Sequence, residues 1–207
     1  MIMSLDNPLT TRNANTKNGT IIIVDISGFT EFVYKTRLIE GKDILLRLLS
    51  CIIEKNKLGL CISEIEGGAV LFYHFGTPPS FKLLLDQFRV MNDYFMRHIE
   101  NINSTLDSPL DLSLKMIGHY GPLTQYQIAG FSKLFGRAVL ESHLLLKNAV
   151  NSNSYVLLTN DFLNRASFNF NEPNFSYYEN EQCEMLRGVK KLCYRFYDFS
   201  CQTGTAW

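Results

Sequence analysis

The alternation of apolar and polar residues along the chain predicts a mixed order of strands and helices. A near-continuous β-branched run over residues 20–26 is typical of a strand that is buried on both faces. Residues 58–64 and 69–75 have the pattern of two further strands, and the turn Glu66-Gly67-Gly68 between them predicts a hairpin. The N-terminal half of a sheet is therefore expected to form around the first run.

Apolar residues at a spacing of three and four predict the helices. The clearest helix follows Pro78-Pro79-Ser80, and its apolar positions are Phe81, Leu84, Leu85, Phe88, Met91, Phe95, Ile99 and Ile102. A short helix is expected from about Thr30, and a longer one after Gly41. The apolar face of that longer helix comprises Ile44, Leu45, Leu48, Leu49, Ile52 and Ile53. A fourth helix is predicted over residues 136–150.

The remaining segments complete one α+β sheet with helices on one face. The strands expected are residues 112–119, 123–129 and 155–159, followed by a hairpin over 184–199 that turns near Gly188. A turn at Tyr120-Gly121-Pro122 is predicted to separate the first two of these strands. The domain is expected to span residues 19–200, with a flexible polar arm at 1–18 and a tail at 201–207.

Composition restricts the class of protein. With 207 residues, of which 46% are hydrophobic and 19% charged, the chain suits one globular domain. Twenty basic residues balance twenty acidic ones, so we expect neither a nucleic-acid nor a membrane partner. No apolar run approaches the ~18 residues of a spanning helix, and the first residues lack signal-peptide features. These observations predict a cytoplasmic protein.

Cysteine and histidine residues offer no metal-ligand pattern. The five cysteines show no Cys-x-x-Cys pair, and their odd number and scattered positions predict reduced thiols that behave as small buried apolar groups. The four histidines have none of the spacings typical of zinc ligands.

The most informative chemistry follows the first strand. Asp25 ends the apolar run, and Ser27-Gly28-Phe29-Thr30 then turns into a helix. A carboxylate at that position, beside a helix N-terminus, suits a metal-bound polyphosphate. A second carboxylate would come from residues 64–70, where Gly68 has no side chain. The pattern indicates the architecture of an enzyme from which part of the chemistry has been removed.

Five segments resemble, in order, the motifs of the class III nucleotide cyclases, which make cyclic AMP or cyclic GMP. The segments are residues 22–30, 64–68, 116–122, 134–139 and 186–189. The resemblance extends from Thr20 to Phe199. Within the family, the chain resembles a bacterial subgroup of uncharacterised cyclase-like proteins. It implies a ferredoxin-like βαββαβ cyclase-type sheet with helices on one face and a C-terminal β-hairpin. It also implies a homodimer whose nucleotide sites are built from both subunits.

The resemblance implies a two-metal site of which only part is present. In the family two aspartates hold two divalent ions, Mg²⁺ or Mn²⁺, which bind the triphosphate. Asp25 matches the first aspartate, and the backbone carbonyl of Ile26 matches a further ligand, but Gly68 stands at the second aspartate. Leu140 and Leu144 stand at the positions of an Asn and an Arg that orient ribose and stabilise phosphate charge.

The nucleotide-binding positions are also incomplete. The turn Ser27–Thr30 matches the family's, and Glu64 matches the base-selecting glutamate of guanylate cyclases. Its partner position holds Lys133, which suits neither base, so Glu64 and Lys133 could pair with each other.

Each of these residues also has a purely structural interpretation. Asp25 could cap the following turn, Gly28 could serve only a tight turn, and Glu66, the one candidate to replace the lost aspartate, could be a solvated hairpin residue. The two leucines could pack in the core or at a dimer contact. His143 and Lys147 lie on a neighbouring helix face, where they could reach an anion or remain solvated.

Three functions follow from these alternatives. The first is a pseudo-cyclase, a catalytically inactive domain that dimerises, regulates or binds a nucleotide. The second is a divergent active cyclase that uses Glu66 and one metal to convert a nucleoside triphosphate into a cyclic monophosphate. The third is one half of a heterodimeric cyclase.

Overall fold

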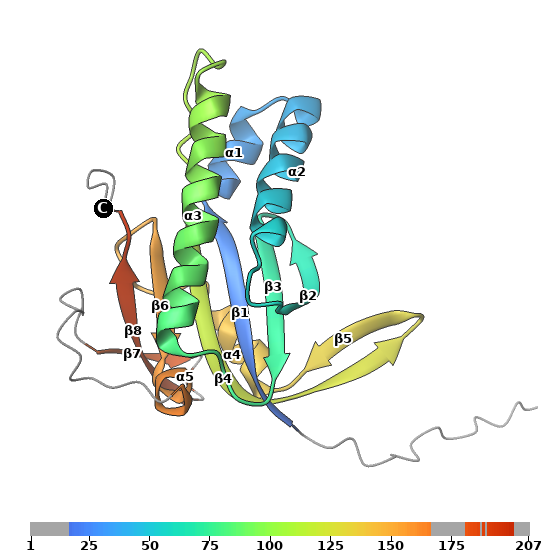
Figure 1. The fold of residues 1–207 in the computed structure, drawn as a ribbon, viewed down its shortest axis with the longest axis vertical. Helices are drawn as coiled ribbons and strands as arrows, with labels where there is room; N and C mark the ends of the chain where they lie inside the picture. The colour runs from blue at the N-terminus through green and yellow to red at the C-terminus, as the bar shows by residue number, and fades with distance from the viewer. Residues whose placement is uncertain (1–16, 167–180, 187, 189, 201–207) are drawn as a thin grey trace, which may run out of the picture.

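The computed structural model describes residues 17–166, 181–186, 188 and 190–200 (Figure 1). The arm expected at 1–18 and the tail at 201–207 lie outside these residues, except for Lys17 and Asn18, with which the first strand begins. The expected C-terminal hairpin lies within them apart from positions 187 and 189.

The described strands form one open sheet. They are β1 (Lys17–Ser27), β2 (Cys61–Glu66), β3 (Ala69–Phe75), β4 (Ser113–Ile128), β5 (Phe131–Phe135), β6 (Tyr155–Thr159), β7 (Gln182–Leu186) and β8 (Lys190–Asp198). Their order is β2-β3-β1-β4-β6-β8-β7, with β5 paired to the outer half of β4. The antiparallel set β2-β3-β1-β4 is the ferredoxin-like part of the sheet, and β7–β8 is the expected C-terminal hairpin, so the predicted fold class is confirmed.

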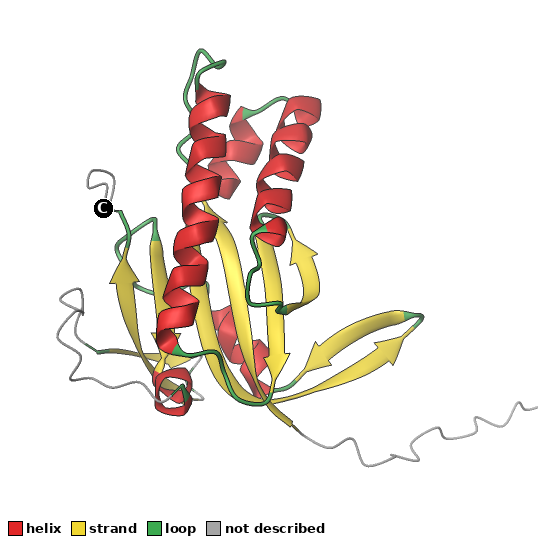
Figure 2. Cartoon of the chain, viewed as in Figure 1, coloured by secondary structure: helices red, strands yellow, loops and turns green. Residues whose placement is uncertain are grey.

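The described helices are distributed over both sides of that sheet. They are α1 (Phe29–Lys35), α2 (Leu38–Glu54), α3 (Phe81–Asn103), α4 (Arg137–Leu145) and α5 (Asn160–Arg165). The long helices α2 and α3 cover one face, as predicted (Figure 2). The short α4 packs on β1 and β4 from the other side (Figure 1). None of the described helices is long and apolar enough to cross a membrane.

Strand β1 is an interior strand of the sheet, between β3 and β4, and its apolar residues are buried on both faces. Ile22, Val24 and Ile26 point into the core that α2 and α3 cover. Ile21 and Ile23 point to the other face, where they pack against the helix α4. Side chains alternate between the two faces of a strand, so Asp25 belongs to the face that α4 covers.

The predicted turn at Tyr120-Gly121-Pro122 is wrong, because β4 runs through these residues without a break. They pair with Thr20, Gly19 and Asn18 of β1. A Cβ at Gly121 would lie 3.4 Å from the Cβ of Ala138, which is ordinary van der Waals contact, so this glycine neither turns the chain nor is required by packing. The close approach lies at Gly136, just before α4, where a Cβ would lie 2.5 Å from the Pro122 carbonyl oxygen. The chain reverses instead at Ala129 and Gly130, both with positive φ, and returns as β5, which the sequence did not predict.

Two helix boundaries also differ from the prediction. Gly41 lies inside α2 instead of before it, since a Cβ there would meet the Thr36 hydroxyl at 2.7 Å and the helix needs this close approach. The helix predicted over 136–150 ends at Leu145. The helix α5, not predicted, begins at the cap Thr159, whose hydroxyl accepts a hydrogen bond from the Phe162 amide.

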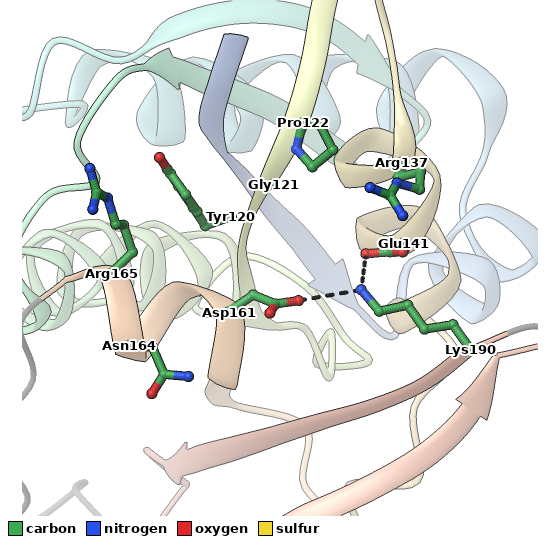
Figure 3. A pocket seen from close by; sticks show the side chains of 9 residues that line it. All are labelled: Tyr120, Gly121, Pro122, Arg137, Glu141, Asp161, Asn164, Arg165 and Lys190. Atoms are coloured by element: carbon green, nitrogen blue, oxygen red, sulfur yellow. Dashed lines mark hydrogen bonds and ion pairs between the residues drawn. The ribbon is translucent and has the colours of Figure 1, made fainter. Parts of the chain in front are cut away.

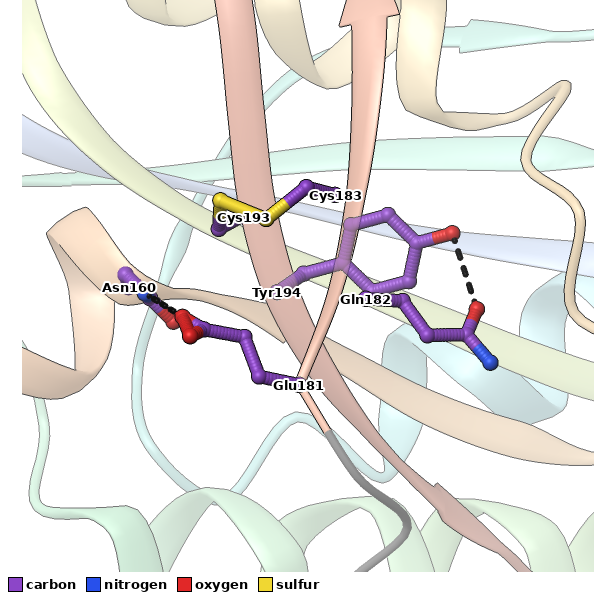
Figure 4. The surroundings of a disulfide bond; sticks show 6 residues. All are labelled: Asn160, Glu181, Gln182, Cys183, Cys193 and Tyr194. Atoms are coloured by element: carbon purple, nitrogen blue, oxygen red, sulfur yellow. Dashed lines mark hydrogen bonds between the residues drawn. A yellow bond between two sulfur atoms is a disulfide. The ribbon is translucent and has the colours of Figure 1, made fainter.

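The expectation that every cysteine is a reduced, buried thiol is wrong. Cys183 and Cys193 face each other across β7 and β8 and form a disulfide (Figure 4). Their spacing of ten residues matches no Cys-x-x-Cys pattern, and the hairpin register alone brings them together. Cys51 is buried as expected, Cys61 is exposed, and Cys201 lies outside the described residues.

Reduction of this disulfide is expected to lower the free energy of unfolding by about 2–3 kcal/mol, because the unfolded chain regains the entropy of a ten-residue loop. Denaturant unfolding with and without dithiothreitol measures the difference. The double variant Cys183→Ala/Cys193→Ala should show no response to the reductant. Equal numbers of alkylated thiols before and after reduction of the wild-type chain would contradict the disulfide.

Candidate functional site

A cleft of about 250 Å³ lies at the carboxyl end of β1, between the β2–β3 hairpin and α4. Its lining brings together several residues that the sequence singles out from separate segments. These are Asp25, Phe29, Glu64, Glu66, Gly68 and His143. The other lining residues are Ile23, Gly67, Ala69, Leu71 and Leu146, so the floor of the cleft is apolar.

The carboxylate of Asp25 forms an ion pair with Lys115. The register between β1 and β4 places the two residues opposite each other, and the Lys115 Nζ lies 3.1 Å from the Asp25 Oδ2. Both side chains are largely buried, with exposed fractions of 18% and 21%. Lys115 also donates to the backbone carbonyl of Leu146 at 3.4 Å. The negative charge at the end of β1 is thus already balanced within the protein.

The position of the absent second aspartate is filled by an aromatic ring. A Cβ built on Gly68 would lie 2.8 Å and 2.9 Å from two ring atoms of Phe29, closer than a carbon atom can approach. The backbone of Gly68 is held in place, because its carbonyl accepts a hydrogen bond from the Ile26 amide at 3.1 Å. A side chain at position 68 therefore requires Phe29 to move.

Glu64 is held by two basic residues. Lys133 on β5 donates to its carboxylate at 2.8 Å, which is the pairing that the sequence left open. The His143 Nε2 on α4 lies 3.5 Å from the other carboxylate oxygen. The hydrogen bond to Glu64 and its negative charge raise the pKa of Lys133. The base-selecting position of the resemblance is therefore engaged in contacts within the chain.

Glu66 differs from the two other carboxylates of the cleft. It ends β2 with an exposed side chain, and it has no hydrogen bond or ion pair with any other described residue. Of the three carboxylates that line the cleft, it is the one available to an external cation.

The remaining predicted nucleotide-binding residues lie outside the cleft lining. Gly28 has φ 83°, and a Cβ there would meet the backbone carbonyl of Asp111 at 2.4 Å, so the glycine is required by the turn and by packing. Ser27 pairs with Ser113 at the end of β1. Thr30 is exposed in the first turn of α1.

Leu140 and Leu144 also lie outside the lining of the cleft at the end of β1. Leu140 is 60% exposed, whereas Leu144 packs against the C-terminal core cluster. His143 of α4 and Leu146, the residue that follows the helix, line the cleft. Lys147, considered beside His143, is exposed and does not line the cleft.

Sequence reasoning missed two residues that determine the character of the site. Lys115 lies in a strand-like segment, but its place opposite Asp25 depends on the register between β1 and β4. Phe29 was expected in the nucleotide-binding turn, but its ring covers Gly68 instead. Only a three-dimensional neighbour relation reveals either role.

The donor set does not fit a pair of divalent metal ions. Two dications need several oxygen ligands that are free of other cations. Here Asp25 is paired with Lys115, Glu64 is paired with Lys133, and position 68 offers no oxygen from a side chain. Within the described part of the chain, Glu66 alone among these carboxylates has no ion pair, although its charge acts on Lys133.

The fold is that of a class III nucleotide cyclase catalytic domain. The adenylyl cyclase CyaB from P. aeruginosa superimposes with a TM-score of 0.67 at 16% identity, over 89% of this chain and 95% of that one. The guanylyl cyclase Cya2 gives 0.60 at 13%, over 93% and 98%. The guanylate cyclase domain of RhGC from Catenaria anguillulae, solved in complex with GTP, gives 0.57 at 15%, over 88% and 96%.

The chain belongs to the family described as protein of unknown function (DUF2652), whose sequence pattern matches residues 45–155. Comparison with curated protein sequences finds no match. The matched segment runs from α2 to the start of β6 and includes Glu64, Gly68, Lys115 and Lys133.

The variant Gly68→Asp is expected to lower the free energy of unfolding by about 1–3 kcal/mol, because the new side chain overlaps the Phe29 ring. Chemical denaturation measures this cost. In the background of Phe29→Ala the same substitution should cost at least about 1 kcal/mol less, since the ring is gone. Equal costs in the two backgrounds would show that the ring does not fill this space.

Proposed function

We propose that this chain is a catalytically inactive cyclase-fold domain, a pseudo-cyclase that acts as a homodimeric regulatory or binding module. The observation that supports this most directly is the Asp25–Lys115 ion pair beside the ring that covers Gly68. The Lys115 ammonium group gives Asp25 the positive charge that the resemblance assigns to a dication. The Phe29 ring packs against position 68, to which the resemblance assigns a carboxylate.

The energetic argument concerns charge. A metal-bound triphosphate brings a high concentration of charge that the protein must balance with carboxylates and cationic donors in defined positions. The resemblance assigns four such positions to Asp25, Gly68, Leu140 and Leu144, and only Asp25 has a charged side chain. Loss of an arginine of this type costs ~10³-fold or more in phosphoryl transfer, although losses within one catalytic unit do not add.

A nucleotide remains a reasonable ligand for the module. The cleft has room for part of a small ligand, and His143 and Lys133 on its edge are cationic or protonatable. One metal ion, Mg²⁺ or Mn²⁺, would enter with the nucleotide and meet Glu66 first. That glutamate is the observation that favours the second candidate, a divergent active cyclase.

Exposed apolar side chains support the homodimer. Four lie on the β4–β5 hairpin, which extends away from the rest of the sheet (Figure 1), and a fifth lies on α4. They are Tyr126, Ile128, Phe131, Phe135 and Leu140, with exposed fractions of 46–70%. A patch of this kind on a folded domain usually marks an interaction surface.

The cytoplasmic location predicted from the sequence stays a prediction. Stable disulfides are uncommon in reducing compartments, so the redox state of Cys183 and Cys193 in cells tests it directly.

Incubation with ATP, GTP, CTP or UTP and Mn²⁺ or Mg²⁺ is expected to give no cyclic monophosphate above the level of the Asp25→Ala variant. Mass spectrometry of the products makes the measurement. A product that disappears in Asp25→Ala would contradict the pseudo-cyclase and support the second candidate. Loss of that product in Glu66→Gln would then identify Glu66 as the replacement ligand.

The chain is expected to be a dimer at micromolar concentration in size-exclusion chromatography with light scattering. The substitutions Phe131→Glu and Phe135→Glu should each raise the dimer dissociation constant at least about tenfold, because they place charge in an apolar contact. Ile39→Glu, at an apolar residue of α2 that is 66% exposed, is the matched control and should have no effect. A monomeric wild-type chain would contradict the homodimer.

A further inference from the structure

A second and larger cleft lies on the other side of α4. It has a volume of about 400 Å³ and is bounded by β4, α4, α5 and the start of β8 (Figure 3). Arg137 and Glu141 line it from one face of α4, whereas His143 and Leu146 face the first cleft. Residues four apart share a helix face, so the two clefts are separated by the helix itself.

The wall of the second cleft is a buried polar network. The Thr159 Oγ1 lies 2.8 Å from the His119 Nδ1, and the His119 Nε2 lies 2.8 Å from the Glu141 Oε2. Lys190 donates to the same Glu141 oxygen at 3.0 Å. Burial alone raises the pKa of Glu141, but the hydrogen bonds from His119 and Lys190 outweigh it and hold the pKa below its ordinary value. Glu141 is thus an ionised acceptor whose Oε2 is shared by His119 and Lys190.

This network does not leave a vacant cation site. Ligand atoms of His119, Glu141 and Asp161 lie within 4.8 Å of one another, a spacing that a metal ion could bridge. The Lys190 Nζ already lies between the two carboxylates, at 3.0 Å from Glu141 and 3.4 Å from Asp161. The ammonium group supplies the positive charge that a metal would bring.

Two arginines of the cleft are free. Arg137 and Arg165 line it from α4 and α5, and neither forms a hydrogen bond or ion pair with any part of the chain that the structure describes. In Figure 3 they lie on opposite sides of the cleft, with the half-buried ring of Tyr120 near Arg165. Lys190 is paired with Glu141 and Asp161. The guanidinium groups of Arg137 and Arg165 are therefore the positive charges of the cleft that no described carboxylate pairs with.

We propose that this second cleft binds a small organic molecule with two anionic groups, one on Arg137 and the other on Arg165. Guanidinium groups form paired hydrogen bonds with carboxylate or phosphate oxygens, and such charge-assisted bonds are stronger than neutral ones. A volume of about 400 Å³ holds a metabolite-sized molecule but not a macromolecule. Tyr120 supplies an apolar surface for the carbon skeleton between the two charges.

The proposal does not depend on the proposed function, because the residues of this cleft do not line the one that contains Asp25. Isothermal titration calorimetry at low ionic strength tests it on the full chain. The probes are inorganic phosphate, fructose 1,6-bisphosphate and citrate, which separate a single anion, a bisphosphate and a polycarboxylate.

We expect the bisphosphate or citrate to bind at least about tenfold more tightly than inorganic phosphate. Arg137→Gln and Arg165→Gln should each weaken that binding at least about tenfold, with unchanged thermal unfolding. The matched control is Arg47→Gln, an exposed arginine on α2 that removes the same charge outside the cleft and should leave binding unchanged.

Preference for the bisphosphate identifies a phosphorylated ligand, and preference for citrate identifies a carboxylate, and both outcomes support the site. Absence of binding of all three probes at concentrations up to ~10 mM would overturn it. It would equally be overturned if Arg47→Gln weakened binding as much as the two cleft variants, because the interaction would then follow net charge alone.

Discussion

The burial of β1 on both faces, between β3 and β4, is the constraint on which the rest of the structure depends. A strand with apolar side chains on both faces needs a covering layer on each side. The helices α2 and α3 supply one layer, and α4 supplies part of the other. Asp25 is the charged residue near the carboxyl end of this apolar run, so its carboxylate lies at the end of an interior strand, on the face that α4 covers.

That position makes the charge of Asp25 costly unless it is balanced nearby. Cyclase-fold enzymes are expected to balance it with metal ions, whereas this chain balances it with Lys115 from the neighbouring strand. The same principle recurs at Glu64, which pairs with Lys133, and at Glu141, which accepts from His119 and Lys190. Three carboxylates that could serve an external cation are therefore satisfied by the chain itself.

The helix α4 contributes to two of these groups, through His143 beside Glu64 and through Glu141 itself. Its two sides line two different clefts, one largely apolar at the end of β1 and one lined by Arg137 and Arg165, which have no ion pair with the described residues. Gly136, just before the helix, permits this end of α4 to approach β4 closely, because a Cβ there would lie 2.5 Å from the Pro122 carbonyl oxygen. This domain thus has two clefts, while position 68 has no side chain and Asp25 is paired with Lys115.

The sequence by itself predicted most of the elements in their order, though not β5 or α5, together with the α+β class and the absence of a side chain at Gly68, because periodicity and residue identity are local properties. It also allowed the pairing of Glu64 with Lys133. It did not predict the continuous β4, the hairpin that follows it or the disulfide between Cys183 and Cys193. Those features, like the pairing of Lys115 with Asp25 and the ring of Phe29 over Gly68, depend on strand register and on side chains from distant segments. Only the tertiary structure decides such contacts, since a shift of one residue in register would move every one of these side chains to the opposite face of the sheet.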